Sequence, residues 1–378
     1  MKGTRIDIKR VMKVRKLIID RYLDIIITYS IYLTKLKKLK RTSLALILFF
    51  CISSFSNSQN YPSPDRLFYE TEPLELKLTF SSKEVKINTN DSTFVDIPLY
   101  VSDQQKWDTI NVSLRARGNF RRSTCFFPPI RMEIKKKARK ETLFEHYKKT
   151  KIVFPCLIED EMNDNILKEF IAYKLFELVS PYHFRTRALK LNYTDNSEKL
   201  AKKFILPGFL IEDDSRIAKR TQAKVYKKYI HPKSLDAEAA INDSMFQYFL
   251  GNTDFSMAYQ HNGKLVQVGE SVIPIPYDFD MTGWVNPSYA VANTSLGLNS
   301  VEERVYRGYQ REVSIIEKVR QQYLKLAPDF FDIISCYETE FDSPKEFERI
   351  VKFTESFFEI LENDTSFQQN IIDQLRTR

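Results

Sequence analysis

The side chains best suited to chemistry gather between residues 245 and 283. An Asp-x-Asp pair, Asp278 and Asp280, follows two short apolar runs, and an earlier loop carries Asp254 and Asn262. Alternate residues of a strand point to the same side, so the paired carboxylates either converge on one ligand or repel each other. A divalent cation resolves this, because Mg²⁺ takes oxygen ligands from one or two carboxylates and from substrate phosphates. The stretch therefore predicts a cation site around the pair.

Two other kinds of site fit less well. Asp278-x-Asp280-x-Thr282-Gly283 opens like a calcium loop, but the twelfth position holds Tyr289 where a bidentate Glu is needed. The chain has no Gly-x-x-x-x-Gly-Lys, Gly-x-Gly-x-x-Gly or Gly-x-Ser-x-Gly, so P-loop, dinucleotide-binding and serine-hydrolase sites lack their motifs. His261 is more typical of a loop hydrogen bond than of a general base.

A second polar cluster reads Arg117-Gly118-Asn119-Phe120-Arg121-Arg122. Gly-Asn is common in a plain hairpin turn. Three arginines beside exposed backbone could instead hold phosphate, and the sequence leaves both interpretations open.

The elements that must position these residues change along the chain. Alternating, β-branched and aromatic runs predict strands up to residue 154, and a 3.6-residue period follows Asn163. Two more strands, a polar link and a mostly helical C-terminal part complete the order. Strands are predicted at 74–80, 94–101, 109–117, 130–136, 151–154, 186–193 and 204–211, and helices from 235, at 301–326, 330–337, 345–362 and 367–378.

The positive charge belongs to the first 58 residues. They hold 13 Lys or Arg and 3 Asp or Glu, so the rest of the chain carries 45 basic and 46 acidic residues. A near-neutral body argues against the clustered basic face of a nucleic-acid-binding protein. Basic residues at 35–41, an apolar h-region at 44–55 and small residues before Gln59 predict a signal peptide cleaved near Ser58. We expect export to the periplasm or cell surface, with only transient membrane contact, and an uncleaved anchor is the alternative.

Three cysteines remain beyond this leader: Cys125, Cys156 and Cys336. An odd number permits at most one internal disulfide, and Cys125 and Cys156 are the nearer pair. The chain has no Cys-x-x-Cys and only four His, which gives little support to zinc.

The order of elements predicts an α+β, two-lobed, protein-kinase-like fold. A β-rich N-terminal lobe with one helix would span 59–212, and a helical C-terminal lobe would span 213–378. In such folds a loop Asp orients the acceptor hydroxyl, and an Asn and a second Asp hold the metal that bridges the nucleotide phosphates.

The motifs also resemble those of the CotH-type (spore-coat protein H) secretory kinases, in their exported Bacteroidetes branch, and the broader HipA-like set. The similarity covers most of 110–290 and is carried by Arg115-Ala116-Arg117-Gly118-Asn119, Pro207-Gly208-Phe209-Leu210-Ile211-Glu212, Gly251-Asn252-Thr253-Asp254, His261-Asn262 and Pro276-Tyr277-Asp278-Phe279-Asp280.

The resemblance implies a role for each matching residue. Asp254 would be the catalytic-loop aspartate. Mg²⁺ or Mn²⁺ would be held by Asn262, Asp278 and Asp280. Nucleotide-binding positions, with ATP as co-substrate, would be Arg117 or Lys151 for the phosphates, Glu169 as their partner and Glu212 at the link near adenine.

Three functions follow. The first is metal-dependent phosphoryl transfer from a nucleotide to a protein or other surface acceptor. The second is an inactive binding or surface-assembly protein, because Asn262 follows Asp254 by eight residues where kinase loops have about five. The third is a metal-dependent hydrolase at Asp278 and Asp280, which would form product without nucleotide.

Overall fold

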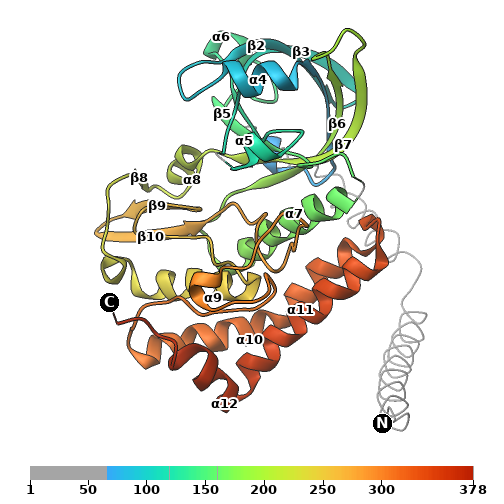
Figure 1. Cartoon of the computed structure of the whole chain (residues 1–378). Coiled ribbons are helices and arrows are strands. Elements are labelled where there is room, and N and C mark those ends of the chain that lie inside the picture. The colour runs from blue at the N-terminus through green and yellow to red at the C-terminus, as the bar shows by residue number, and fades with distance from the viewer. Residues whose placement is uncertain (1–65, 119, 160, 378) are drawn as a thin grey trace, which may run out of the picture. The chain divides into compact units, whose positions relative to one another are not determined.

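The computed structural model describes residues 66–377 apart from 119 and 160 (Figure 1). The predicted leader at 1–58, with its signal peptide, lies outside the described residues. Within the described part, no helix combines the length and apolar character that crossing a membrane requires.

The first half of the described chain forms a closed seven-stranded barrel (Figure 1). The strands neighbour one another in the order β1 (Leu74–Phe80), β2 (Val95–Asp103), β3 (Lys106–Ala116), β4 (Ile130–Glu133), β5 (Lys149–Val153), β7 (Lys202–Glu212) and β6 (Thr186–Asp195). Alternate residues of β1 are buried, as its period-two pattern predicts. All neighbours are antiparallel except β6 and β1, whose parallel pairing sets Leu74 opposite Leu189 and closes the barrel.

This barrel overturns the predicted fold class. The expected two-lobed kinase-like fold has an N-terminal lobe with one helix, whereas here a closed mixed barrel is accompanied by several. They are α3 (Arg66–Tyr69), α4 (Ser82–Asn88), α5 (Phe120–Thr124), α6 (Lys136–Arg139) and the long α7 (Glu161–Val179). The prediction was wrong because barrel closure depends on a pairing between strands more than 100 residues apart. In addition, helices as short as α3 to α6 show no 3.6-residue period in the sequence.

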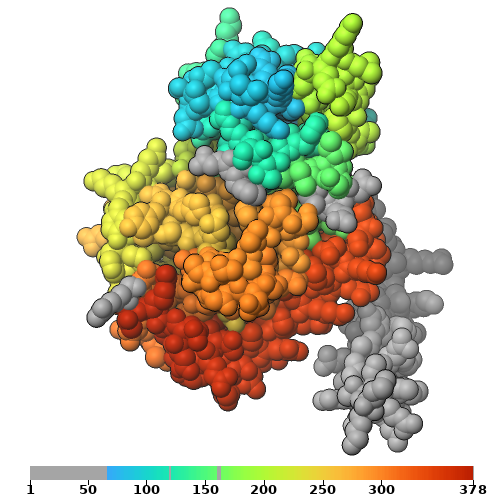
Figure 2. Space-filling model, in the orientation of Figure 1, coloured from blue at the N-terminus to red at the C-terminus, as the bar shows by residue number. Residues whose placement is uncertain are grey.

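The second half is helical around a small sheet of order β10-β9-β8. Its elements are α8 (Asp214–Arg220), β8 (Lys224–Tyr226), η1 (Pro232–Ser234), α9 (Ala237–Leu250), β9 (Gly263–Val268), β10 (Ser271–Pro276), η2 (Thr294–Leu296), α10 (Val313–Cys336), η3 (Glu338–Glu340), α11 (Pro344–Glu362), α12 (Asp364–Phe367) and η4 (Gln368–Ile372). In Figure 2 the segment after β10, in orange, lies below the barrel and beside the red helices.

The helices predicted at 301–326 and 330–337 are also corrected. One helix, α10, runs through Pro328, and residues 301–312 form no helix. The helix continues because residues on both sides of the proline, Tyr323 and Phe330, bury their rings in the same core. Residues 304–311 form no helix or strand apart from an isolated bridge at Tyr309. Three arginines among them donate to backbone carbonyls of other segments: Arg304, Arg307 and Arg311.

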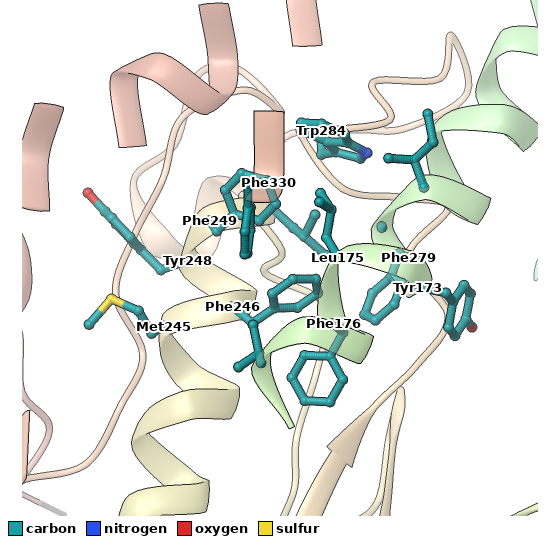
Figure 3. Packing of buried hydrophobic residues seen from close by; sticks show 14 of the residues in the cluster. Tyr173, Leu175, Phe176, Met245, Phe246, Tyr248, Phe249, Phe279, Trp284 and Phe330 are labelled. Atoms are coloured by element: carbon teal, nitrogen blue, oxygen red, sulfur yellow. The ribbon is translucent and has the colours of Figure 1, made fainter. Parts of the chain in front are cut away.

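An aromatic core joins α7, α9 and the segment after β10 (Figure 3). The ring centroid of Phe279 lies 4.7 Å from that of Tyr173 and 5.7 Å from that of Phe246. Trp284 packs on Phe249 at 5.2 Å. The Asp-Phe-Asp motif is thus anchored by its central ring.

Candidate functional site

The Asp-Phe-Asp motif lies just beyond the end of β10. Phe279 is buried in the aromatic core, and the backbone N–H of Asp278 donates to the Tyr173 hydroxyl at 2.9 Å. Asp278 has a left-handed backbone, φ 69°, which is uncommon outside glycine. Because the strand ends at Pro276, the alternation of strand side chains does not set the direction of the two carboxylates. The buried ring and the Tyr173 contact hold them instead.

Each carboxylate of the motif has an arginine from the barrel beside it. Arg117 Nη1, just after β3, lies 3.9 Å from Asp278 Oδ1. Arg121 Nη1, on α5, lies 3.4 Å from Asp280 Oδ2, and both of these side chains are about nine-tenths buried. Residues separated by about 160 positions therefore form two ion pairs.

Glu169, on α7, adds a third carboxylate. It is 1% exposed, and neither carboxylate oxygen has a hydrogen-bond partner. Burial, and then the charge of Asp280, raise the pKa of Glu169 well above its usual range, with Arg121 and Arg117 acting in the opposite direction. Burial also raises the pKa of Asp280 to about 6. Two acidic groups here hold their protons more tightly than usual.

We name Arg117, Arg121, Glu169, Asp278 and Asp280 the buried charge cluster. Several of its buried polar atoms lack hydrogen-bond partners, namely Nε and Nη2 of Arg117, Nε and Nη1 of Arg121, both oxygens of Glu169 and Oδ2 of Asp280. Burying charges without full pairing is costly. Perturbed, incompletely paired groups of this kind are typical of functional sites.

Lys151, on β5, lies beside the buried charge cluster. Its Nζ stands 4.2 Å from the ring centroid of Tyr277 and 4.9 Å from that of Phe184. Burial, together with the charges of Arg117 and Lys264, lowers the pKa of Lys151 to about 7. The positive charges acting on Glu169 are those of Arg121 and Arg117, so the arginines rather than this lysine neighbour the helix carboxylate.

Asp254, His261 and Asn262 form a separate and exposed group, which we name the loop triad. His261 Nε2 lies 2.9 Å from Asp254 Oδ1. Asn262 Nδ2 donates to the backbone oxygen of Asp254 at 2.7 Å and to Oδ2 at 3.1 Å. Both Asp254 and His261 side chains are more than half exposed.

The end of α9 sets the position of the loop triad. Gly251 caps the helix in a left-handed conformation, φ 63°, which glycine adopts without steric cost. Asn252 then accepts from the Asp254 N–H at 2.9 Å and donates to Gln247 at 2.7 Å. These bonds fix the loop whose side chains remain in solvent.

One backbone bond relates the two groups. The Tyr277 N–H donates to the Asn262 oxygen at 3.3 Å, extending the β9–β10 ladder by one step toward Asp278. The structure thus places Asn262 just before β9 and Asp278 just after β10. Asn262 is bonded to Asp254 rather than to either motif carboxylate.

Glu212 lies elsewhere, at the end of β7. Its carboxylate accepts from Arg220 Nη2 at 2.8 Å and from the Arg185 N–H at 2.8 Å. It is 1% exposed. Its side chain stabilises the turn into α8, so any adenine contact at this link would fall to the backbone.

Among the residues that the structure describes, no three His, Cys, Asp or Glu side chains could hold a metal ion together. The predicted set of Asn262, Asp278 and Asp280 contains only two acids. The donor chemistry fits an ion held by one or two carboxylates plus substrate phosphates, which is the arrangement that Mg²⁺ favours.

The only disulfide in the described part of the chain steadies α5. Cys125 and Cys156 are joined, with Cα atoms 4.6 Å apart, and Cys336 is a free thiol. The Cys125 N–H donates to the Arg121 oxygen at 2.9 Å, and Arg121 Nη2 donates to the Phe154 oxygen at 3.3 Å. The nearer-pair prediction is confirmed, and the bridge ties the turn bearing Arg121 to the end of β5.

Sequence reasoning missed Arg121, Tyr173 and Tyr277 as members of this region. The arginine cluster at 117–122 was the available signal, but only Arg117 was carried to the site. Nothing in the sequence separates Arg121, which meets Asp280, from Arg122, whose guanidinium donates to the Lys86 and Thr89 carbonyls.

Compared with known proteins, the chain matches no family model and no curated protein. The resemblance to the CotH-type kinases therefore remains a resemblance of short motifs.

Proposed function

We propose that this chain is an exported, metal-dependent phosphotransferase of the CotH-like kind, which transfers a phosphoryl group from a nucleotide to a hydroxyl acceptor on a protein or another surface molecule. The observation that carries the proposal is the buried charge cluster. Its two guanidinium groups and two of its carboxylates, Glu169 and Asp280, keep buried polar atoms without hydrogen-bond partners, although each such atom costs about 1–3 kcal/mol. Phosphate oxygens would accept from the guanidinium N–H groups, and a bound cation would supply positive charge to the carboxylate oxygens.

The cations would hold the phosphates. Arg117 and Arg121 each keep unpaired guanidinium N–H groups, and guanidinium matches phosphate oxygens through paired hydrogen bonds. Lys151 stands next to Arg117 with a lowered pKa, and a nearby phosphate would favour its charged form. Glu169 would orient the arginines, because the charges of Arg121 and Arg117 act on its carboxylate and its oxygens have no hydrogen-bond partner.

The metal would be held by Asp278 and Asp280, with phosphate oxygens completing its shell. When bound, a Mg²⁺ or Mn²⁺ ion supplies positive charge that stabilises the charge developing on the transferring group. Arg121 meets Asp280 at 3.4 Å, so this carboxylate would exchange one cationic partner for another.

Asp254 would act on the acceptor. Its carboxylate is exposed, and His261 and Asn262 orient it. As the acceptor oxygen bonds to the γ-phosphorus, the bond to the bridging oxygen breaks and the nucleoside diphosphate leaves with the electron pair. Asp254 receives the hydroxyl proton, a role that contributes about 10²–10⁴-fold to such reactions.

Export is supported by the bridge between Cys125 and Cys156. Disulfides persist in oxidising compartments and are rare in the cytoplasm. A surface acceptor follows from this location.

An inactive binding or assembly protein is the second candidate. It is favoured by the ion pairs Arg117–Asp278 and Arg121–Asp280, which already neutralise both motif carboxylates. A structural charge network has the same composition without turnover.

The test is incubation of the mature chain with γ-labelled nucleotide and Mn²⁺, followed by detection of label on itself or on co-exported proteins. We expect transfer with the wild type and at least a hundred-fold less with Asp278→Asn. Asp329→Asn, an exposed acid on α10, is the matched control and should transfer normally.

Nucleotide binding separates the candidates. If nucleotide with Mg²⁺ raises the melting temperature of the wild type but not of Asp278→Asn, the site binds nucleotide. Nucleotide binding without phosphoryl transfer supports the inactive binding or assembly protein. No melting shift in the wild type contradicts the phosphotransferase, and product formed without nucleotide would assign the pair to hydrolysis.

A further inference from the structure

A cavity of about 60 Å³ lies behind the loop triad, away from the buried charge cluster. The start of α9, the loop at 255–258, residues 307–311 and the C-terminal Arg376 line it. This volume accommodates about four water molecules, or an anion of four or five heavy atoms.

The cavity is unusually cationic. Three arginines line it, namely Arg307, Arg311 and Arg376, and Asp243 is the one acid among the lining residues. Burial lowers the pKa of all three guanidinium groups, and the charge of Arg376 lowers that of Arg307 further. The carboxylates of Asp254 and Asp236, which act on Arg307 and Arg311, lie outside the lining.

Asp243 does not neutralise these charges. It is 2% exposed, and burial raises its pKa to about 8. At neutral pH it is mostly protonated, so it offers an O–H donor.

Three lining groups have polar atoms without partners in the described structure. They are Nε of Arg311, Nε of Arg376 and Oδ1 of Asp243, all buried. The remaining donors of Arg311 bind backbone oxygens, including that of Pro232 at 2.9 Å, which satisfies N–H groups without removing charge. Arg376 lies with its Cζ 4.1 Å from the ring centroid of Tyr309.

We propose that this cavity binds a small oxyanion, a phosphate or carboxylate group, held by Arg311, Arg376 and Asp243. The anion supplies the acceptors and the negative charge that the lining lacks, and hydrogen bonds to charged donors are the strong ones. The site does not depend on the proposed phosphotransfer.

An anion bound in the cavity would affect the loop triad through Arg307. Its Nη1 donates to the backbone oxygens of Thr253 and Phe255, the two neighbours of Asp254. Because Arg307 also lines the cavity, an anion held there by Arg311 and Arg376 would also steady the loop that presents Asp254.

The test is the melting temperature of the mature, disulfide-bonded chain in inorganic phosphate against chloride at equal ionic strength. We expect phosphate to raise the wild-type melting temperature by about 2–4 °C at twenty times the dissociation constant. Arg376→Gln should weaken phosphate binding about ten-fold. If Arg376→Gln does not fold, Arg311→Gln should show the same loss.

Two controls locate the effect. Lys227→Gln removes an exposed charge outside the lining and should respond like the wild type. Lys151→Met removes a cation beside the buried charge cluster and should also keep the response. No rise with phosphate or acetate in the wild type, an equal rise in Arg376→Gln, or loss of the rise in Lys151→Met would overturn the proposal.

A further pair of ligands identifies the source of the anion. A response to inorganic phosphate alone assigns the cavity to a free ion. An equal response to O-phosphoserine assigns it to an anionic group carried on a larger molecule, such as an acceptor.

Discussion

The buried charge cluster and the loop triad both contain acids with cationic or amide partners, but their surroundings differ sharply. Arg121, Glu169 and Asp280 are less than a tenth exposed, and burial raises the pKa of both carboxyls. Asp254 and His261 are more than half exposed. Solvent therefore screens the loop triad and not the cluster.

This difference indicates separate roles for the two groups. A buried set of opposite charges is pre-organised to hold a highly charged ligand, because its field is strong and its side chains cannot move far. An exposed acid held by two neighbours can meet a large acceptor that arrives from solvent. The predictions below test whether the two groups are separable in this way.

The largest expected effect is on transfer. Asp254→Asn removes the proton acceptor, so we expect the rate of phosphoryl transfer to fall about 10²–10⁴-fold, while the nucleotide-dependent rise in melting temperature stays unchanged. Labelled-nucleotide assays and thermal melts on the same preparations measure both. Glu270→Gln, an exposed acid in the β9–β10 hairpin, is the control. A parallel loss of the melting shift would show that the two groups are one site.

The next effect is on stability. Arg121→Met leaves Glu169 and Asp280 buried without their nearest cation, and removing one partner of a buried charge pair costs about 3 kcal/mol or more. Arg122, on the same short helix, donates to two backbone carbonyls, so Arg122→Met should cost only about 1–2 kcal/mol. Urea unfolding at pH 7 gives both values. Equal losses would mean that Arg121 is an ordinary structural arginine.

The same contrast shows how far the sequence could be read. The alternation of Leu74–Phe80 predicted β1 to the residue, and the Asp-Phe-Asp motif was located by its residue types. The contact between Arg121 and Asp280 spans about 160 residues and depends on a barrel closed by β1 and β6. Local patterns carry no information on such pairings, so the motif was found and its closest cation was not.

A smaller effect concerns the pH dependence of stability. The folded-state pKa of Asp280 is about 6, above the value of about 3.9 in an unfolded chain. The folded state therefore binds the proton more tightly, and this contribution is present below pH 4 and lost as the pH rises through 6. Asp280→Asn should reduce the decline in the free energy of unfolding over this pH range by about 1–2 kcal/mol. Unfolding free energies between pH 4 and 7 test it, and superimposable curves for the two proteins would contradict it.

The last effect concerns the protonation of Lys151. Burial and two neighbouring cations lower the folded-state pKa of Lys151 to about 7, from an ordinary value of 10.5. The folded state thus binds fewer protons than the unfolded state between these values, and stability should rise with pH from about 7 to 10. Lys151→Met should flatten this rise by about 3 kcal/mol, whereas Lys224→Met, at an exposed lysine of β8, should not.

Proton uptake by Lys151 on nucleotide binding gives a test of the site. At pH 8 Lys151 is mostly neutral, and phosphate oxygens beside it would restore its charge. Binding should then take up about 0.9 proton, measurable by calorimetry in two buffers of different ionisation enthalpy. Lys151→Arg keeps the positive charge but cannot titrate in this range, so its uptake should vanish while binding persists. If wild type and Lys151→Arg take up the same number of protons, the phosphates bind away from β5, and only Arg117 and Arg121 remain to hold them.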